Sequence, residues 1–372
     1  MKSQDAFSRV AIVGLGLMGG SAAAAINYFD KGCTVAGVDY PQELEKAIDR
    51  GIIDRGFQPE RLEKAVRGSE LVILATPVAT IIDLVRILPE HLEQGGLVTD
   101  FGSTKRAISQ AGTEAFSDSD AHFIGGHPMT GSETTGIEGA HPLLFENSIF
   151  VLTPSENVPT AALNRLADFV KGLGAEPLKM RPEEHDRIAA RVSHLPQLLA
   201  TTLVNFLNQG QSEEKRKGAR LAGGGFRDMT RIADSPYKMW EDIFLTNEQF
   251  IQEEADKFLE EFKGLIEDFT PCRIRESFRS AGELRSNLGK GGKGFSSSLH
   301  RVAVMVPDRP AALADITAKI AEEGLNIRDL ELQKVREDYG GTFHIMFASR
   351  DAAEAAAVAL NDDDYQARLI KQ

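Results

Sequence analysis

The chain has 372 residues, of which 42% are hydrophobic and 26% charged, and its formal net charge is −13. This length predicts two or three domains, and the composition is that of an ordinary globular protein, not a disordered one. The acidic balance argues against a nucleic-acid-binding protein, which would normally be basic, and the longest apolar stretch near the N-terminus, residues 22–26, is too short to span a bilayer.

Short β-branched runs alternate with helical patterns over the first 180 residues. Helices are indicated at residues 43–50 and 81–88, and strands are indicated at residues 10–13, 34–38, 71–75, 97–100, 122–125 and 148–152. Continuous apolar runs of this kind are typical of buried parallel strands. We therefore expect residues 1–180 to form an α/β domain of the Rossmann type, a doubly wound sheet with helices on both faces.

The pattern changes at residue 181. Strand-like runs vanish for about a hundred residues, and apolar side chains recur at helical spacing on more than one face. Such helices have more than one side to bury. We expect an all-helical domain over residues 181–286, and the sequence leaves open whether its apolar faces form its own core, a dimer interface, or both.

The last quarter of the chain begins with a segment rich in glycine and serine. Residues 287–298 hold four glycines and three serines, a composition typical of a linker. The region 299–372 is predicted to be a small α+β domain with a β-α-β-β-α order, with strands at 301–306, 327–335 and 342–348 and helices at 311–323 and 351–360.

Cysteine usage and the N-terminal residues bear on location. Cys33 and Cys272 lie far apart and have no CxxC spacing, which predicts neither a disulfide framework nor a cysteine-based metal site. The first residues lead into a strand and not into a signal-peptide core. We therefore expect a cytoplasmic protein that contacts neither membrane nor nucleic acid.

A glycine-rich turn follows the first predicted strand. Gly14, Gly16 and Gly19 form a G-x-G-x-x-G motif that leads into a helix of small residues, the context that a dinucleotide site requires. Gly14 allows the tight turn, Gly16 the close approach of a pyrophosphate, and Gly19 close packing of helix on strand. The helix N-terminus offers N–H groups to the phosphates, so Leu17 and Met18 are also expected at the cofactor.

The end of the second predicted strand indicates which dinucleotide binds. Asp39 can accept hydrogen bonds from both ribose hydroxyls of an adenosine and would repel a 2′-phosphate, and residues 40–42 contain no arginine. We predict NAD over NADP, with Thr76 after the third strand as a further contact. The alternative is a glycine-rich turn without a ligand, in which Asp39 only caps a loop.

A histidine follows the fifth predicted strand. His127 stands between Gly126 and Pro128, and ligands of doubly wound sheets bind beyond the carboxyl ends of the strands. We therefore expect His127 and the loop 100–105 to face the nicotinamide. Histidine titrates near neutral pH and is a ready general base, although a surface or hydrogen-bonded core histidine is the alternative.

With these motifs the chain resembles the prephenate dehydrogenase family of tyrosine biosynthesis. The resemblance rests on the glycine-rich turn and on residues 100–105 (DFGSTK), 126–128 (GHP) with 131 and 133, 193–196 (SHLP), 224–233 (GGFRDMTRIA), 235–236 and 239–240. It implies a Rossmann domain followed by a helical domain that forms a homodimer. It also implies oxidative decarboxylation of prephenate to 4-hydroxyphenylpyruvate, with NAD taking the hydride and no metal required.

The resemblance implies individual roles. His127 would hydrogen-bond the ring hydroxyl and draw its proton as hydride leaves, and Ser103 would orient that hydroxyl and His127. Arg231 would clamp a substrate carboxylate through two parallel N–H bonds. His194 would lie near the pyruvyl chain, and Glu133 would gate or shape the pocket.

Other interpretations of these residues stay open, and Gly224 joins the expected substrate site through its motif. Arg231 could instead pair with Asp228 or Asp234, Ser103 could cap the following helix, and His194 could be a capping or buried histidine.

Residues 301–372 resemble an ACT domain, a small regulatory fold that binds amino acids. The match lies in residues 302–304, 307–310, 313 and 324–327. Such domains usually pair side by side, and the resemblance implies tyrosine as an end-product effector. Where the pattern commonly has glycine, this chain has Ala311, whose methyl group could crowd an effector, and a purely structural pairing module is the alternative. The expected effector residues are Asp308, Arg309, Ala311, Asn326 and Ile327.

Two further functions stay open. One is an arogenate dehydrogenase, whose substrate carries an amino group in place of the keto group and needs an amine-binding carboxylate. The other is a non-catalytic sensor of NAD and an amino acid. His127, Ser103 and Arg231 argue against a sensor, which has no use for a proton acceptor.

Overall fold

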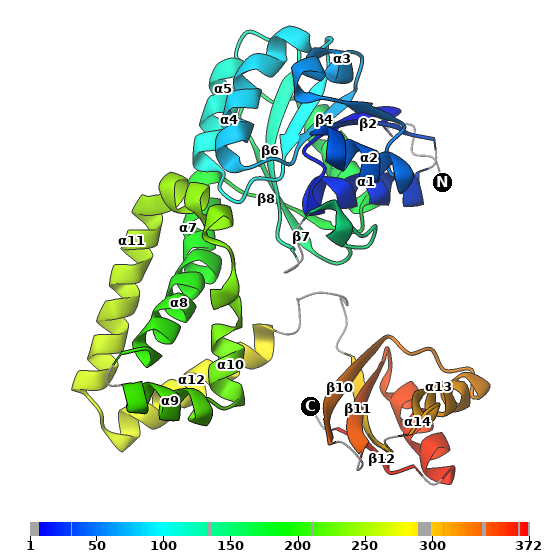
Figure 1. Ribbon diagram of the computed structural model, residues 1–372, viewed down its shortest axis with the longest axis vertical. Coiled ribbons are helices and arrows are strands. Elements are labelled where there is room, and N and C mark those ends of the chain that lie inside the picture. The colour runs from blue at the N-terminus through cyan, green and yellow to red at the C-terminus, as the bar shows by residue number, and fades with distance from the viewer. Residues whose placement is uncertain are drawn as a thin grey trace. The chain divides into compact units, whose positions relative to one another are not determined.

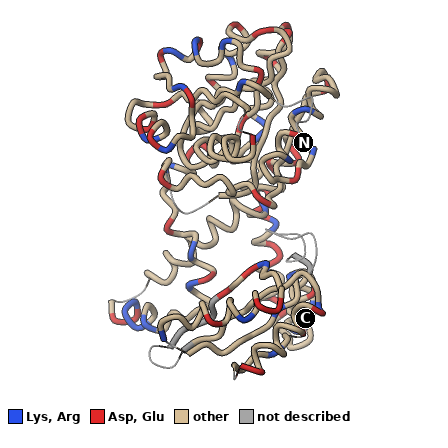
Figure 2. The backbone as a smooth tube through the Cα atoms, turned by 90° about the vertical axis from the view of Figure 1, so that its right-hand side faces the viewer, with Lys and Arg blue, Asp and Glu red and all other residues tan. Residues whose placement is uncertain are grey.

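The computed structural model describes residues 7–30, 32–131, 136–209, 212–288, 299–307, 309–336, 340–363 and 365–370. The chain divides into two compact units, Met1–Glu276 and Ser277–Gln372. Figure 1 shows the first unit in blue to yellow and the sheet of the second in orange and red. Lysines and arginines are interspersed with aspartates and glutamates along both units (Figure 2).

An eight-stranded sheet forms the first half of unit 1, in the order β3-β2-β1-β4-β5-β6-β7-β8. From β3 to β6 all neighbouring strands are parallel, which confirms the predicted Rossmann-type sheet. However, β7 runs antiparallel to β6, and β8 is parallel to β7. The strands are β1 (Arg9–Val13), β2 (Thr34–Val38), β3 (Arg55–Phe57), β4 (Leu71–Leu74), β5 (Leu97–Asp100), β6 (His122–Pro128), β7 (Ile149–Pro154) and β8 (Glu176–Lys179).

Helices cover both faces of this sheet (Figure 1). In β1, Val10 and Ile12 join a core with α1 and α6, whereas Ala11 and Val13 join a core with α3, α4 and α5. This alternation is the period of two that a strand buried on both faces requires. The elements are α1 (Leu17–Phe29), α2 (Pro41–Asp49), η1 (Pro59–Arg61), α3 (Leu62–Val66), α4 (Val78–Ile87), η2 (Leu88–His91), α5 (Arg106–Ala115), η3 (Ile137–Gly139) and α6 (Thr160–Gly172).

The rest of unit 1 is helical over the described residues. It comprises α7 (Pro182–Ala189), the π-helical turn η4 (Ala190–His194), α8 (Leu195–Leu207), α9 (Ser212–Leu221), α10 (Gly224–Thr230), η5 (Arg231–Asp234), α11 (Tyr237–Glu267) and α12 (Pro271–Leu288), which crosses into unit 2. The first two residues of the predicted linker, 287–288, are thus helical, and residues 289–298 lie outside the described chain.

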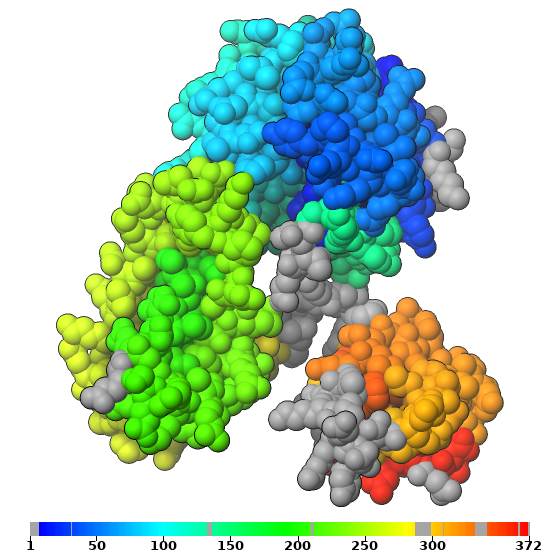
Figure 3. Space-filling view, viewed as in Figure 1, coloured from blue at the N-terminus to red at the C-terminus, as the bar shows by residue number. Residues whose placement is uncertain are grey.

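The helical half buries little of its apolar surface. Its own core holds Ala190, Phe250 and Ile251. In contrast, Phe206 is 66% exposed and Leu221 is 83% exposed in the single chain. The space-filling view shows this green to yellow segment at the surface (Figure 3). Of the helices described, none has the length and apolar character to cross a membrane.

Unit 2 holds a four-stranded antiparallel sheet in the order β10-β11-β9-β12. Val302, Val304 and Ile345 from the strands pack with Ile316 and Leu360 from the two helices. The last strand was missed by the sequence analysis because it has only three residues, and it makes the order βαββαβ. The elements are β9 (His300–Val306), α13 (Ala312–Glu322), β10 (Asp329–Arg336), β11 (Gly340–Phe347), α14 (Arg350–Asp362) and β12 (Ala367–Leu369).

Ala311, directly before α13, has left-handed backbone angles, with φ 67° and ψ −3°. A Cβ atom in this region costs about 1–2 kcal/mol, which is why glycine is common there. The position where the sequence pattern expects glycine is therefore one where glycine has a physical advantage.

We predict that Ala311→Gly stabilises unit 2 by about 1 kcal/mol, because it removes the left-handed strain. Hydrogen exchange of the β9 and β11 amides measures this as roughly fivefold stronger protection. Ala314→Gly is the matched control, since Ala314 is exposed inside α13 and its change should weaken protection by a similar factor. Equal effects of the two substitutions would contradict the prediction.

Candidate active site

The turn between β1 and α1 has the shape that its glycines were expected to permit. Gly14 has φ 92°, and a Cβ there would lie 2.7 Å from the Ala75 carbonyl oxygen. A Cβ on Gly19 would lie 1.8 Å from the Gly14 oxygen, so α1 packs directly on the turn. A Cβ on Gly16 would meet no atom within 4 Å. The turn is tight at its ends and open in the middle.

The surroundings of this turn fit a dinucleotide. Leu17 and Met18 open α1. The N-cap residue is Gly16, which has no side chain to occupy the helix N-terminus. Asp39 accepts hydrogen bonds from the backbone N–H groups of Leu15 (2.6 Å) and Tyr40 (2.7 Å), and each carboxylate oxygen keeps a lone pair for a ribose hydroxyl. These groups could hold a nucleotide with its phosphates at the helix N-terminus.

Thr76 adds a polar atom to the same turn. A Cβ on Gly14 would lie 2.9 Å from its Cγ2, so Thr76 packs directly beside the first glycine. The Thr76 Oγ1 is buried and has no hydrogen-bond partner in the described part of the chain. A buried hydroxyl is normally hydrogen-bonded, so this atom is suited to a bound ligand.

A buried ion pair ties the end of β5 to β6. Asp100 and Lys105 are both fully buried and pair with each other. Lys105 Nζ also donates to the Gly126 carbonyl oxygen (2.7 Å), and Asp100 Oδ1 accepts from the Gly126 N–H (3.1 Å). Burial raises the pKa of Asp100 and lowers that of Lys105, while their mutual attraction opposes both shifts. The backbone is therefore held in place one residue before His127.

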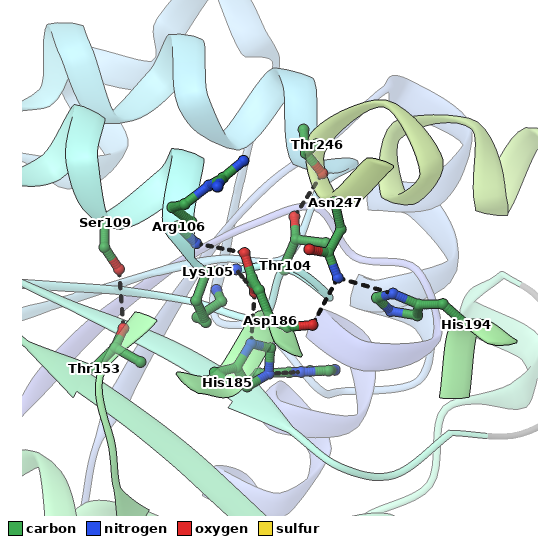
Figure 4. Close-up of polar contacts among 12 residues, drawn as sticks. Thr104, Lys105, Arg106, Ser109, Thr153, His185, Asp186, His194, Thr246 and Asn247 are labelled. Atoms are coloured by element: carbon green, nitrogen blue, oxygen red, sulfur yellow. Dashed lines mark hydrogen bonds and ion pairs between the residues drawn. The ribbon is translucent and has the colours of Figure 1, made fainter. Parts of the chain in front are cut away.

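His127 lies half-buried near the carboxyl end of β6 and belongs to a chain of side chains. Its Nδ1 is 2.8 Å from His185 Nε2, and His185 Nδ1 is 2.7 Å from Asp186 Oδ1. Figure 4 shows His185 and Asp186 in this chain. Burial, followed by the charges of His185, Lys105 and His194, lowers the pKa of His127 well below its usual value. The neutral ring is the form that can accept a proton.

His194 ends the π-helical turn η4 and is buried. Asn247 Nδ2 lies 3.1 Å from His194 Nδ1 and donates to the Asp186 carbonyl oxygen at 2.8 Å (Figure 4). Burial lowers the pKa of His194 to about 4 against the opposing attraction of Asp186. Trp240 packs its ring edge-on against His194 with centroids 6.1 Å apart.

Ser103 lies half-buried in the loop between β5 and α5. The preceding Gly102 N–H donates to Asp100 (2.8 Å), and the following Thr104 hydroxyl bonds Thr246 of α11 (2.8 Å). At the start of α5 the carboxylate of Asp186 accepts from the N–H groups of Lys105 (2.6 Å) and Arg106 (2.8 Å). The capping role considered for Ser103 is thus filled by Asp186.

Two further expected substrate residues, Arg231 and Gly224, lie in the helical half. Arg231 begins η5 and is exposed in the single chain, and η5 is held to α8 by Gln197 Nε2, which donates to the Ile232 oxygen at 3.0 Å. His194 and Gln197 are three positions apart and so share a helix face. Gly224 is exposed and begins α10, and a Cβ added there would meet no atom within 4 Å. Glu133 lies outside the described residues.

The expected effector residues are divided by α13. Arg309 and Ala311 precede this helix, and Asn326 and Ile327 follow it. Eleven helical residues span ~16 Å, so one copy of unit 2 does not bring the two pairs together. Arg309 is engaged by Asp315 at 2.7 Å. Asp308 is outside the described part of the chain.

Family models match most of unit 1. The model of the prephenate dehydrogenase nucleotide-binding domain matches residues 23–179, and that of the dimerization domain matches residues 181–276. The chain is 34% identical to prephenate dehydrogenase of Bacillus subtilis over 93% of this chain and 94% of the relative. The chain belongs to the prephenate dehydrogenase family. It is thus a dehydrogenase, as the sequence resemblance implied.

Solved structures of two dehydrogenases are similar to this chain over about three quarters of its length. Prephenate dehydrogenase of Aquifex aeolicus, in complex with hydroxyphenyl propionate and NAD+, is 31% identical, with a TM-score of 0.67, covering 77% of this chain and 98% of that one. Arogenate dehydrogenase of Synechocystis is 27% identical, with a TM-score of 0.65, covering 76% and 99%. The two similar enzymes are named for different substrates, one for prephenate and the other for arogenate.

Four residues of this cluster are not predicted as site residues by the local sequence pattern. Lys105 belongs to the motif 100–105 without a predicted role of its own, and no motif marks His185, Asp186 or Asn247. The adjacent pair His185-Asp186 directly follows the change from strands to helices, which is the one local signal available. Their contacts reach across 58 to 81 positions of sequence, and no local spacing announces such pairs.

We predict that acid weakens unit 1 partly through His194. Its folded pKa of about 4 lies below the unfolded value of about 6.5, so the unfolded chain takes up the proton first and stability falls as the pH drops from 6.5 towards 4. The loss from pH 8 to pH 5 is about 2 kcal/mol. Urea unfolding followed by fluorescence of Trp240, the single tryptophan, should show His194→Gln with a loss smaller by this amount. An identical acid loss in both proteins would contradict this assignment.

Proposed function

We propose that the chain catalyses the NAD-dependent oxidative decarboxylation of prephenate to 4-hydroxyphenylpyruvate. The observation that carries this proposal is the state of His127. Its Nδ1 is engaged by His185, and its lowered pKa keeps the ring neutral, so Nε2 is left to accept the proton of a substrate hydroxyl. A positioned neutral imidazole is an effective general base near neutral pH.

The proposed cofactor is NAD. The open space at Gly16, the carboxylate of Asp39 and the buried hydroxyl of Thr76 suit an adenine dinucleotide without a 2′-phosphate. The family's nucleotide-binding model and the NAD+ in the Aquifex structure support this choice. When bound, NAD supplies the hydride acceptor.

The remaining steps belong to the chain's own residues. His127 takes the hydroxyl proton as the hydride leaves the same ring carbon, and Ser103 orients the hydroxyl. The ring carboxylate then leaves as carbon dioxide, its bonding electrons complete the aromatic ring, and the resulting phenolate oxygen takes the proton back from His127. In the proposal Arg231 binds a carboxylate of the dianion, His194 lies at the pyruvyl chain, and Glu133 and Gly224 shape the pocket.

Prephenate is favoured over arogenate by the surroundings of His194. Arogenate carries an ammonium group that needs a carboxylate partner. Asp186 is the carboxylate whose charge acts on His194, but three donors already engage its two oxygens. The name of the Bacillus relative also favours prephenate.

We further propose a homodimer formed through residues 181–276. Large apolar side chains of this region are exposed in the single chain, among them Met229 at 70% and Leu245 at 71%. Surfaces of this kind mark association sites, and the matching family model is that of a dimerization domain. Because these side chains are not buried in the core of the single chain, their exposure supports a dimer interface among the alternatives that the sequence leaves open.

Unit 2 is proposed to be an ACT-like regulatory domain that binds tyrosine. The βαββαβ order and the left-handed Ala311 support the resemblance. Because Arg309 and Asn326 lie at opposite ends of α13, a site that uses both requires two copies of unit 2. Regulation then follows from the different affinities of two states for the effector.

The activity is tested by mixing the purified chain with prephenate and NAD and following NADH absorbance. We expect turnover with this pair and lower kcat/KM with arogenate or NADP. His127→Asn should lower kcat by ~10²–10⁴-fold, the usual share of general base catalysis, while NAD binding is kept. His122→Asn, on the same strand β6, is the control with wild-type kcat. Absence of NADH with every substrate would end the proposal, and full turnover of His127→Asn would remove His127 from its role.

Tyrosine is predicted to inhibit the wild-type chain. Asn326→Ala should weaken this inhibition at least tenfold, measured as the tyrosine concentration that halves the rate. Glu322→Ala, an exposed change near the end of α13 and outside the expected effector set, should leave that concentration unchanged. A rate that never responds to tyrosine would contradict the regulatory proposal and leave the catalytic one intact.

A further inference from the structure

With an uncharged imidazole at His185, the chain of side chains that ends at His127 has only one consistent arrangement of hydrogens. The Asp186 carboxylate, fully buried, accepts from the N–H groups of Lys105 and Arg106, so it acts as an ionised acceptor. The carboxylate must then also accept a hydrogen bond from His185 Nδ1, which lies 2.7 Å away and therefore carries a hydrogen. A neutral imidazole has one donor and one acceptor nitrogen, which makes His185 Nε2 an acceptor.

The tautomer of His185 in turn fixes the tautomer of His127. Its Nδ1 lies 2.8 Å from the acceptor His185 Nε2 and therefore carries the hydrogen. The lone pair of His127 is then on Nε2. This is the tautomer that can accept a proton at Nε2, and it is the less common one for free histidine in water.

His194 is set in the opposite sense. The Asp186 carbonyl can only accept, so the atom of Asn247 that faces it at 2.8 Å is the amide nitrogen. The same nitrogen donates to His194 Nδ1 at 3.1 Å, which places the His194 hydrogen on Nε2. Asn247 interrupts the helical backbone of α11, with φ −123° and ψ 16°, and is buried. The break and both hydrogen bonds occur at one residue.

We infer that Asp186 is a positioning residue that sets the two active-site histidines in opposite tautomers, His127 through His185 and His194 through Asn247. His127 then presents a proton acceptor at Nε2, and His194 presents a donor at Nε2. The functional part of this inference rests on the proposed function, whereas the tautomers themselves do not. A carboxylate that orients a histidine through its Nδ1–H is known to govern general-base catalysis.

A purely structural role for Asp186 would predict something different. As a cap that joins the start of α5 to α7, it would affect stability but leave the histidine tautomers to their preference in water. The tautomers therefore separate the two roles, and they are measurable in the chain without substrate.

The experiment is long-range ¹H–¹⁵N NMR of the full chain labelled at histidine, which reports which ring nitrogen carries the hydrogen. The eight histidines are assigned by single substitutions. We expect Nδ1–H for His127 and Nε2–H for His194 in the wild type. An Nε2–H form for His127 or an Nδ1–H form for His194 would overturn the inference, whatever the substrate proves to be.

Variants of the intervening residue test the consequence. His185→Ala removes the acceptor, so His127 should shift towards the Nε2–H tautomer and kcat should fall ~10²–10⁴-fold with little change in KM. His185→Gln offers an amide oxygen to His127 Nδ1–H and should recover most of both losses. His122→Ala, on the same strand as His127, is the control and should leave the His127 tautomer unchanged.

The outcomes are separable. An unchanged His127 tautomer in a folded His185→Ala protein would overturn the inference. If His185→Ala does not fold, the wild-type tautomers and the His185→Gln protein still decide it, because a His185→Gln protein with the Nε2–H form of His127 contradicts the relay. If the tautomers are as expected but prephenate is not turned over, the proposed function fails and the relay stands.

Discussion

The site depends on the carboxylate of Asp186. A buried carboxylate is costly unless hydrogen bonds replace its water, and here the N–H groups of Lys105 and Arg106 and the ring of His185 do so. Two of these donors open α5, whose dipole also favours a negative charge. Because Asp186 lies on α7, the first helix after the sheet, its hydrogen bonds attach the helical half to the loop that follows β5.

A second buried charge acts on the same loop. The pair of Asp100 and Lys105 adds little net stability by itself, since desolvation offsets the attraction. The pair instead fixes the position of the β6 backbone, because both partners also hydrogen-bond the backbone of Gly126. Lys105 thus contributes its side chain to one buried carboxylate and its backbone N–H to the other. The end of β6 and the middle of α7 are positioned by one residue, and His127 and His185 meet as a consequence.

Local sequence patterns predicted the parts of this architecture that depend on neighbours in the chain. The glycines at 14 and 19 are required by close backbone contacts within a short loop, and apolar runs marked the central strands. Edge strands were harder, since β8 is polar and β3 and β12 have only three residues each. The direction of β7 also has no local signal. The roles of His185, Asp186 and Asn247 arise only when distant segments meet, so spacing could not reveal them.

The pairing of buried carboxylates within the protein also explains how a chain of net charge −13 can bind a dianionic substrate. What matters to the proposed substrate is the local charge, not the total. Asp100 and Asp186 are both fully buried and both occupied by donors of the chain. Glu254, likewise buried, is paired with Arg191 and Lys257 at 2.7 Å each, and its pKa falls to about 2. These three carboxylates are thus consumed by structure, and the rings of His127 and His194, whose lowered pKa values favour the neutral form, attract no cation and repel no anion.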